Sequence, residues 1–530
     1  MHSISRIIKK MSLATWMALI FFIGLLVLGF MIYSTYGLGW DEPAQLDISI
    51  FNFRYVVRGN PELLTVQNRW YGPFFEVFLA AVQNESTIQK LYLSRHFWTF
   101  IAYFVGCIFF YFLARRLTKH DGLALIGAIC LVLSPRIFAD AFFNSKDIPF
   151  LVLYTMSLLS MLWFLDKQTL WRGLLHAIIT AGTITIRLPG LIIPALTVLG
   201  LLIELATRRS HWKIVVPHFF LYLVTLIGFG ILFWPALWLD PWHGFLTAYK
   251  FMSHFPYEVA MLFMGRSILS TQLPWYYIPV WIAITTPILY LLTFIPGLIT
   301  IVGYQKNWIK REISSEQRDE TLILLAFLLP LLTVIVIRSV LYDAWRQMFF
   351  IYPPFLLVSI LGLNWSWRQL KNRFSQPLAP VLGIAVLLIG LLPISLWMIN
   401  YHPYQNVYFN RLAGKDMLTV QQNYMMDYWG LSYREGIEAI LAVDDGAYIS
   451  MLVETGSGQI AQQLLHLDEA NRIRAVSTMG EADYFIGNYY MLSKPYPFKD
   501  EIYAVKIGNA KILSVYRLSE EEKKLPFVTR

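Results

Sequence analysis

Residues 13–42 read LATWMALIFFIGLLVLGFMIYSTYGLGWDE, an apolar run that ends in two carboxylates. The run from Leu13 to Tyr33 has the roughly 20 residues that a helix needs to cross a bilayer. Lys9 and Lys10 precede it as in a signal peptide, but no small-residue cleavage site follows it. We therefore interpret it as an uncleaved first transmembrane helix.

The rest of the chain has the same apolar character. Of its 530 residues, 57% are hydrophobic and only 15% are charged, where soluble proteins carry about 25%. Mean hydropathy is +0.52. The composition predicts an all-α polytopic membrane domain with about eleven transmembrane helices. The expected spans are residues 12–33, 97–114, 121–137, 148–165, 172–187, 188–206, 213–235, 275–303, 320–338, 345–363 and 378–400.

Loop charge predicts the orientation of these spans. Residues 1–400 carry a net charge of +12, and the Lys and Arg concentrate in short loops on one side. The positive-inside rule makes that side cytoplasmic, with the N-terminus on it, and gives no reason to expect nucleic acid as a partner. An odd number of spans puts the C-terminus outside. The cationic segments are residues 6–10, 115–119, 167–172, 208–213, 306–318 and 368–373.

Three long segments fall on the outside. Residues 34–95 contain two amphipathic stretches with helical spacing, which we expect to lie in the membrane interface. Residues 236–274 are rich in Trp, Tyr, His and Met. Residues 401–530 have a net charge of −3 and combine apolar alternation with a helical stretch at 432–443. We predict a 1–400 transmembrane domain and a small 401–530 extracytoplasmic α/β domain that covers the outer face.

Ionisable side chains gather at the outer ends of the spans, where the positive-inside rule predicts few cations. Arg and Lys there would suit an anionic phosphate, and a nearby carboxylate could act as general base toward a hydroxyl. A sugar linked to a lipid phosphate is a suitable donor, since its leaving group needs cations more than a proton. These residues are Asp41, Glu42, Arg136, Asp140, Lys146, Asp147, Arg187, Arg338, Asp343 and Arg346.

Structural explanations compete with these roles. Glu42-Pro43 is also a good helix start, and Arg136 or Lys146 could simply snorkel to the interface. Arg187 lies in a turn that leaves it little reach into water. The two cysteines, Cys107 and Cys130, lie in apolar stretches and imply no disulfide framework. No HExxH, CxxC or Walker sequence occurs, so no tight metal or nucleotide site is indicated.

Four motifs resemble type C glycosyltransferases that use polyprenyl-phosphate sugars, and in particular the protein O-mannosyltransferase and lipid A aminoarabinose transferase group. They resemble the first-loop acidic motif, the second outside loop, the opening of a later span and an Arg-to-Pro motif. Together they cover most of residues 30–360. In order they are Gly39-Trp40-Asp41-Glu42, Ser134-Pro135-Arg136 to Asp147-Ile148-Pro149, Leu273-Pro274-Trp275-Tyr276-Tyr277, and Asp343-Ala344-Trp345-Arg346 to Tyr352-Pro353-Pro354.

The resemblance implies the type C fold, a polyprenyl-phosphate-linked sugar donor and inversion at the anomeric carbon. It also implies a first-loop acidic base, which corresponds to Asp41. Adjacent helical positions point about 100° apart, so Asp41 and Glu42 are not expected to share one task. Glu42 would instead orient Asp41, bind the acceptor or help to hold a divalent cation. We expect Lys146, Arg187 and Arg346 to bind the donor phosphate, with Arg136 and Asp147 in support.

The C-terminal domain does not resemble the β-trefoil insert of the eukaryotic mannosyltransferases, which leaves a protein, lipid or glycan acceptor open. The expected location is the outer face of a bacterial cytoplasmic membrane. The main alternative is a multi-pass transporter or lipid-linked sugar flippase, although no internal repeat is evident. A third reading, a scaffold of an envelope complex, rests only on the soluble domain.

Overall fold

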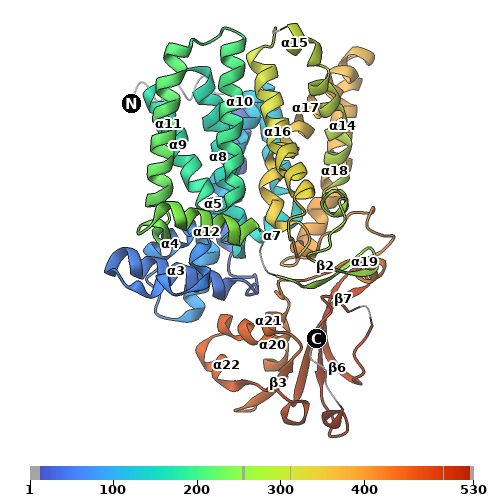
Figure 1. Cartoon of the computed structure of the whole chain (residues 1–530). Helices are drawn as coiled ribbons and strands as arrows, with labels where there is room; N and C mark the ends of the chain where they lie inside the picture. The colour runs from blue at the N-terminus through green and yellow to red at the C-terminus, as the bar shows by residue number, and fades with distance from the viewer. Residues whose placement is uncertain (1–11, 254–256, 311, 493, 526–530) are drawn as a thin grey trace, which may run out of the picture.

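A computed structural model describes residues 12–253, 257–310, 312–492 and 494–525. Upright helices form a bundle, and the C-terminal domain lies against one end of it (Figure 1). We call the other end the far end. Arg6, Lys9, Lys10 and Arg311, which belong to the basic segments above, lie outside the described residues.

The described residues contain eight helices long and apolar enough to cross a membrane, or nine if one bent pair is a single span. The bent pair is α6 with α7, which meet at 67° before Pro135, because proline cannot continue the preceding helix. The protein is thus a multi-pass membrane protein. The eight are α2 (Leu13–Ile32), α5 (Ile88–Thr118), α8 (Asp147–Asp166), η3 (Leu188–Leu191) with α10 (Ile192–Ala206), α11 (Trp212–Leu232), α16 (Ser315–Val336), η5 (Arg346–Ile351) with α17 (Tyr352–Arg373), and α18 (Leu378–Asn400). The pair is α6 (Asp121–Val132) and α7 (Pro135–Phe143).

Two of the eleven expected spans are shorter than predicted. The 172–187 segment is α9 (Leu170–Ile184), and the 275–303 segment is broken before Pro287 into α13 (Tyr277–Thr285) and α14 (Ile288–Val302). Fifteen residues rise about 22 Å, less than the roughly 30 Å of a hydrocarbon core. Both α9 and α14 nevertheless stand in the bundle beside longer helices (Figure 1). The all-α membrane fold is confirmed, and a count of eleven spans stays a prediction.

The segments outside the bundle contain the expected helices. In residues 34–95 these are α3 (Glu42–Arg58) and α4 (Phe74–Val82), with η1 (Pro61–Leu64) and η2 (Gln67–Trp70) between them. Gly59 ends α3 with a left-handed φ of 65°, a conformation that favours glycine. Residues 236–274 form η4 (Pro235–Leu237), α12 (Pro241–Ser253) and a hairpin of β1 (Ala260–Phe263) and β2 (Arg266–Leu269). At the far end, α15 spans Gln305–Lys310.

The C-terminal domain is a small α/β unit, as predicted. Its five-stranded sheet has the order β4-β3-β5-β7-β6, with β3 parallel to β4 and β5, and β7 antiparallel to β5 and β6. The strands are β3 (Ile449–Val453), β4 (Ile473–Ala475), β5 (Tyr484–Asn488), β6 (Asp500–Ile507) and β7 (Ala510–Arg517). The helices after residue 400 are η6 (Gln405–Val407), α19 (Met417–Asn423), α20 (Tyr433–Leu441), α21 (Gly456–Ala461), η7 (Gln462–Leu464), α22 (Leu467–Arg472), η8 (Met479–Glu481) and η9 (Glu522–Lys524).

This domain is fixed to the loop that leads into α3. Arg434 Nη1 donates to the carbonyls of Ser34 (2.7 Å) and Tyr36 (3.2 Å). A Cβ at Gly37 would lie 2.2 Å from the Leu431 carbonyl oxygen, so only glycine permits this approach. The C-terminal domain therefore helps to position the residues that precede Asp41.

Candidate active site

Arg346 forms ion pairs with three carboxylates from three separate parts of the chain. Its Nη2 lies 2.8 Å from Asp41 Oδ2, its Nη1 3.1 Å from Asp147 Oδ2, and its Nε 2.9 Å from Asp343 Oδ2. Asp41 precedes α3, Asp147 begins α8, and Arg346 begins η5. The fold thus brings the ends of these elements to one point beside the C-terminal domain.

Arg187 joins the cluster through Asp147, with which it forms an ion pair. Asn144 Nδ2 donates to the same carboxylate (3.0 Å), and Asn144 Oδ1 accepts from the Asp147 backbone N–H (2.8 Å). These contacts fix Asp147 between two guanidinium groups. Four of the seven predicted site residues, Asp41, Asp147, Arg187 and Arg346, are therefore in direct contact as one network.

Lys146 lies beside this network, half-buried, with its Nζ 3.5 Å from the centre of the Tyr71 ring. Burial and the neighbouring Arg187 guanidinium hold the pKa of Lys146 well below its usual range, although Asp147 and Asp41 oppose that shift. A second anion brought to Lys146 would favour its charged form.

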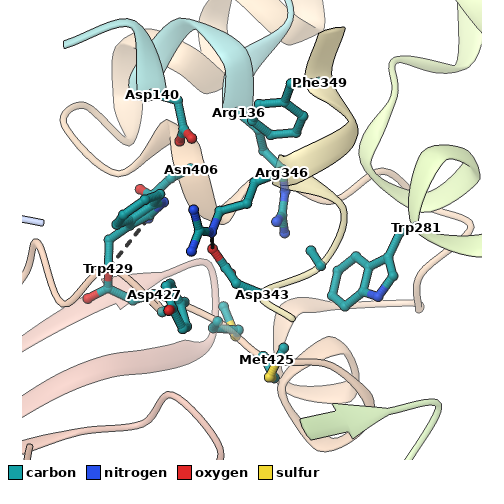
Figure 2. A pocket seen from close by; sticks show the side chains of 13 residues that line it. Arg136, Asp140, Trp281, Asp343, Arg346, Phe349, Asn406, Met425, Asp427 and Trp429 are labelled. Carbon is teal, nitrogen blue, oxygen red and sulfur yellow. Dashed lines mark hydrogen bonds and ion pairs between the residues drawn. The ribbon is translucent and has the colours of Figure 1, made fainter. Parts of the chain in front are cut away.

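The C-terminal domain supplies part of the wall around Arg346. The guanidinium carbon lies 4.7 Å from the centre of the Trp429 ring and 5.5 Å from that of Tyr428, and Tyr342 covers it at 5.1 Å. Figure 2 shows Arg346 extended toward Asp343 with Trp429 alongside. The cavity here is about 20 Å³, room for about one water molecule.

The C-terminal domain, which the sequence predicts to cover the outer face, also contributes residues to this cavity. Met425, Met426, Asp427, Tyr428 and Trp429 line the same cavity as Arg346. Burial raises the pKa of Asp427 to about 6, against hydrogen bonds led by the one from Ser432 that lower it. Its carboxylate holds this segment in place by accepting from Asn488 Nδ2 at 3.1 Å.

Asp343 and Ala344 adopt a backbone conformation that is rare for residues other than glycine. Their φ angles are 53° and 56°, and such strain concentrates at functional sites. Burial raises the pKa of Asp343 to about 7, although Arg346 and Arg136 lower it. The carboxyl that shares Arg346 with Asp41 therefore titrates near neutral pH.

Asp41 and Glu42 point to different partners. Asp41 makes no capping hydrogen bond to α3 and turns to Arg346, with its side chain 28% exposed. Glu42 is buried and accepts from the Gly39 N–H (2.7 Å), and it contacts His96 Nε2 at 3.0 Å. Glu42-Pro43 begins α3, in agreement with the alternative that these residues serve only as a helix start. That explanation accounts for the position of Glu42 and not for the ion pair of Asp41.

Two residues of α5 that the sequence analysis missed support the cluster. Besides His96, the buried Arg95 Nη2 lies 2.5 Å from Glu76 Oε2, and Glu76 Oε1 accepts from Ser145 Oγ at 2.5 Å. These contacts hold the backbone on either side of the site, next to Asp41 and Lys146. Arg95 and His96 could have been identified from the sequence, because ionisable residues this close to an apolar span indicate a functional or structural role.

Arg136 is held away from the network. Its Nε donates to the Tyr408 carbonyl (3.0 Å), and its guanidinium carbon lies 4.5 Å from the centre of the Phe409 ring. It lines the cavity together with Asp140. Among the described residues, no three His, Cys, Asp or Glu side chains are grouped to hold a metal ion. The point between Asp41, Asp147 and Asp343 holds the Arg346 guanidinium.

Part of the bundle is similar in sequence to a known glycosyltransferase family. Residues 88–234 match the model of the family described as dolichyl-phosphate-mannose-protein mannosyltransferase. No curated protein matches the chain by sequence.

Among solved structures, the chain has the fold of ArnT from Cupriavidus metallidurans. In the apo state that structure is 11% identical, with a TM-score of 0.50, over 95% of this chain and 98% of ArnT. The structure of the same ArnT bound to undecaprenyl phosphate is 12% identical, with a TM-score of 0.46 and the same coverage. At this level of identity the likeness concerns the fold.

Proposed function

We propose that this protein is an inverting glycosyltransferase that moves a sugar from a polyprenyl-phosphate-linked donor to an acceptor hydroxyl. The observation that carries the proposal is the 2.8 Å contact between Asp41 Oδ2 and Arg346 Nη2. Of the three carboxylates around Arg346, that of Asp41 is the most exposed to solvent. The contact joins this carboxylate to a cation suited to phosphate. The matched family and the ArnT fold support the same class of reaction.

Asp41 would act as the general base. Its carboxylate takes the proton of the acceptor hydroxyl, whose oxygen forms a bond to the anomeric carbon of the donor. The bond from that carbon to the phosphate oxygen breaks on the opposite side, and the lipid phosphate leaves with the electron pair. Attack opposite the leaving group inverts the configuration. Glu42, held by Gly39 and His96, would keep the Asp41 backbone in place.

Arg346, Arg187 and Lys146 would stabilise the phosphate as its charge grows. Arg346 and Arg187 already have carboxylate partners, and the cavity is only about 20 Å³. A bound phosphate must therefore replace a carboxylate. Asp41 is the best candidate to move, because its side chain is 28% exposed while that of Asp147 is 2% exposed.

The loop charges support a site on the outer face of a bacterial cytoplasmic membrane, with the N-terminus in the cytoplasm. The acceptor in this proposal is a protein, lipid or glycan hydroxyl.

The far end of the bundle argues against the transporter alternative. There, Arg318 is 1% exposed and lies 2.6 Å from both Glu204 Oε1 and Asp319 Oδ1, and Arg116 contacts Asp166 and Asp319, each at 2.6 Å. These ion pairs join α5, α8, α10 and α16. Alternating access would require this end to open, and separating buried ion pairs is strongly destabilising.

Purified protein mixed with a panel of labelled polyprenyl-phosphate sugars and a membrane extract tests the function. We expect label to be transferred covalently from one donor by the native protein and not by Asp41→Asn. Label that crosses a vesicle bilayer on its lipid, with no new glycosidic bond, would instead establish the flippase alternative.

A further inference from the structure

A second cavity lies at the far end of the bundle, between the α8–α9 and α10–α11 loops. It measures about 860 Å³, and its lining includes the cations Lys167, Arg208 and Arg209. Ser210 Oγ donates to Gln168 Oε1 at 2.7 Å and joins the two loops. The loops that line this cavity lie at the end of the bundle that points away from the C-terminal domain (Figure 1).

The charges at the base of this cavity are already balanced. Asp166 pairs with Arg116 and Arg318, and Arg209 pairs with Glu204 at 2.9 Å and donates to the Ile313 carbonyl at 2.7 Å. Three arginines thus meet three carboxylates, Asp166, Glu204 and Asp319. The acidic lining residue, Asp166, does not neutralise the remaining cations.

Lys167 and Arg208 are those remaining cations. Both are exposed, and neither side chain forms a hydrogen bond or ion pair with the part of the chain that the structure describes. Arg208 also has a left-handed φ of 57°, where a glycine or asparagine would be less strained. The cavity therefore presents two positive charges that have no counterion within the described fold.

The rim of the cavity is apolar and exposed. Trp212 is 59% exposed and Ile214 49%, and both line the cavity, while Trp171 nearby on α9 is 67% exposed. Tryptophans of this kind mark the depth of lipid headgroups. A soluble anion would make no contact with this apolar rim. A phospholipid would place its phosphate on the cations and its glycerol and acyl chains against Trp212 and Ile214.

We propose that the cavity between the α8–α9 and α10–α11 loops binds the headgroup of an anionic phospholipid through Lys167 and Arg208. The site lies at the opposite end of the bundle from Asp41 and does not depend on the reaction proposed there. Bound lipid would tie the two loops together over the charged network of Arg116, Arg318 and Glu204.

Native mass spectrometry of the full chain, released from nanodiscs of equal phosphatidylglycerol and phosphatidylcholine, tests the proposal. We expect the native protein to retain phosphatidylglycerol preferentially. Each cation near a membrane surface favours an anionic lipid about fivefold, so Lys167→Gln with Arg208→Gln should lower the preference by about 30-fold. The matched control is Lys371→Gln with Arg373→Gln, which removes the same charge at the end of α17 on the same side.

An unchanged preference in the Lys167 and Arg208 variant would overturn the proposal. An equal loss in the control would also overturn it, because it would show general surface electrostatics. Inorganic phosphate is the third probe. If millimolar phosphate displaces phosphatidylglycerol completely, the cavity is a soluble-anion site and the lipid assignment is wrong. Retention in phosphate, together with loss in the variant alone, supports it.

Discussion

Arg346 forms ion pairs with three carboxylates at once, so no part of its guanidinium is left for a phosphate while all three remain in place. A phosphate can enter only by taking the place of one of them. The side chains around Arg346 therefore differ in what their removal would do. Asp41 is the one expected to move, Asp147 is held by Arg187 as well, and Asp343 titrates near neutral pH.

Asp41→Asn should fold and bind donor but lose about two to four decades of turnover, because the amide cannot accept the hydroxyl proton. Single-turnover transfer from the labelled donor measures this loss. Asp47→Asn, an exposed carboxylate on the same helix, is the matched control and should keep native turnover. Turnover close to native in Asp41→Asn would remove Asp41 from the role of base.

Arg187→Ala should weaken donor binding by more than about 1.5 kcal/mol, the lower end for a hydrogen bond to a charged group. Its side chain is 19% exposed and lies against Asp147, so solvent cannot replace it fully. Equilibrium binding of labelled donor to solubilised protein measures the change. Arg172→Ala, a half-buried arginine of α9 at the far end that contacts Trp163 and no site residue, should bind donor normally. Equal affinity in both variants would contradict the assignment.

Donor affinity should fall as pH rises above about 7. Below that pH Asp343 is protonated and no longer pairs with Arg346 as an anion, and above it the ionised carboxylate competes with phosphate for the same guanidinium. Because its pKa is raised in the folded state, Asp343 also makes stability fall with rising pH between about 4 and 7. Asp343→Asn should bind donor equally well at pH 6 and pH 8. A persistent pH dependence in that variant would assign the titration to another group, such as Lys146.

At the scale of the element, Met425–Trp429 is the segment with the largest consequence. Trp429→Ala removes a ring 4.7 Å from the Arg346 guanidinium, an interaction worth about 2 kcal/mol when desolvated. We expect kcat/KM to fall by roughly an order of magnitude with the C-terminal domain still folded. Trp365→Ala, an exposed tryptophan of α17, is the control. Native kcat/KM in Trp429→Ala would leave this segment as a cover only.

Sequence periodicity predicted most elements and the ends of spans that carry the charged residues. It found the helices α3, α4 and α20, and it detected apolar alternation within the C-terminal domain that forms the sheet. It did not find Tyr428 and Trp429 at the site, because no local pattern reports which distant segment packs on Arg346. The left-handed φ of Asp343 was equally invisible, since nothing in its neighbours requires that conformation.

At the scale of the whole molecule, chemical labelling tests the predicted orientation in the membrane. Tyr448 is 82% exposed on the C-terminal domain and is therefore accessible to a labelling reagent. Tyr448→Cys should react with an impermeant maleimide in intact cells, and Lys371→Cys at the far end only after lysis. Both native cysteines are buried and give little background. Reaction of Tyr448→Cys only after lysis would mean that the span count is wrong by one.

The contact of Trp429 with Arg346 also has a consequence for the order in which the site is synthesised and folded. A chain is made from its N-terminus, so every membrane helix is synthesised before residues 425–429. Arg346 lacks the rings of Tyr428 and Trp429 until the C-terminal domain folds and docks on the loop before Asp41. In the proposed reaction, a ribosome-bound or prematurely terminated chain would hold Asp41 and the cations without a finished site, and it would not consume lipid-linked sugar before synthesis is complete.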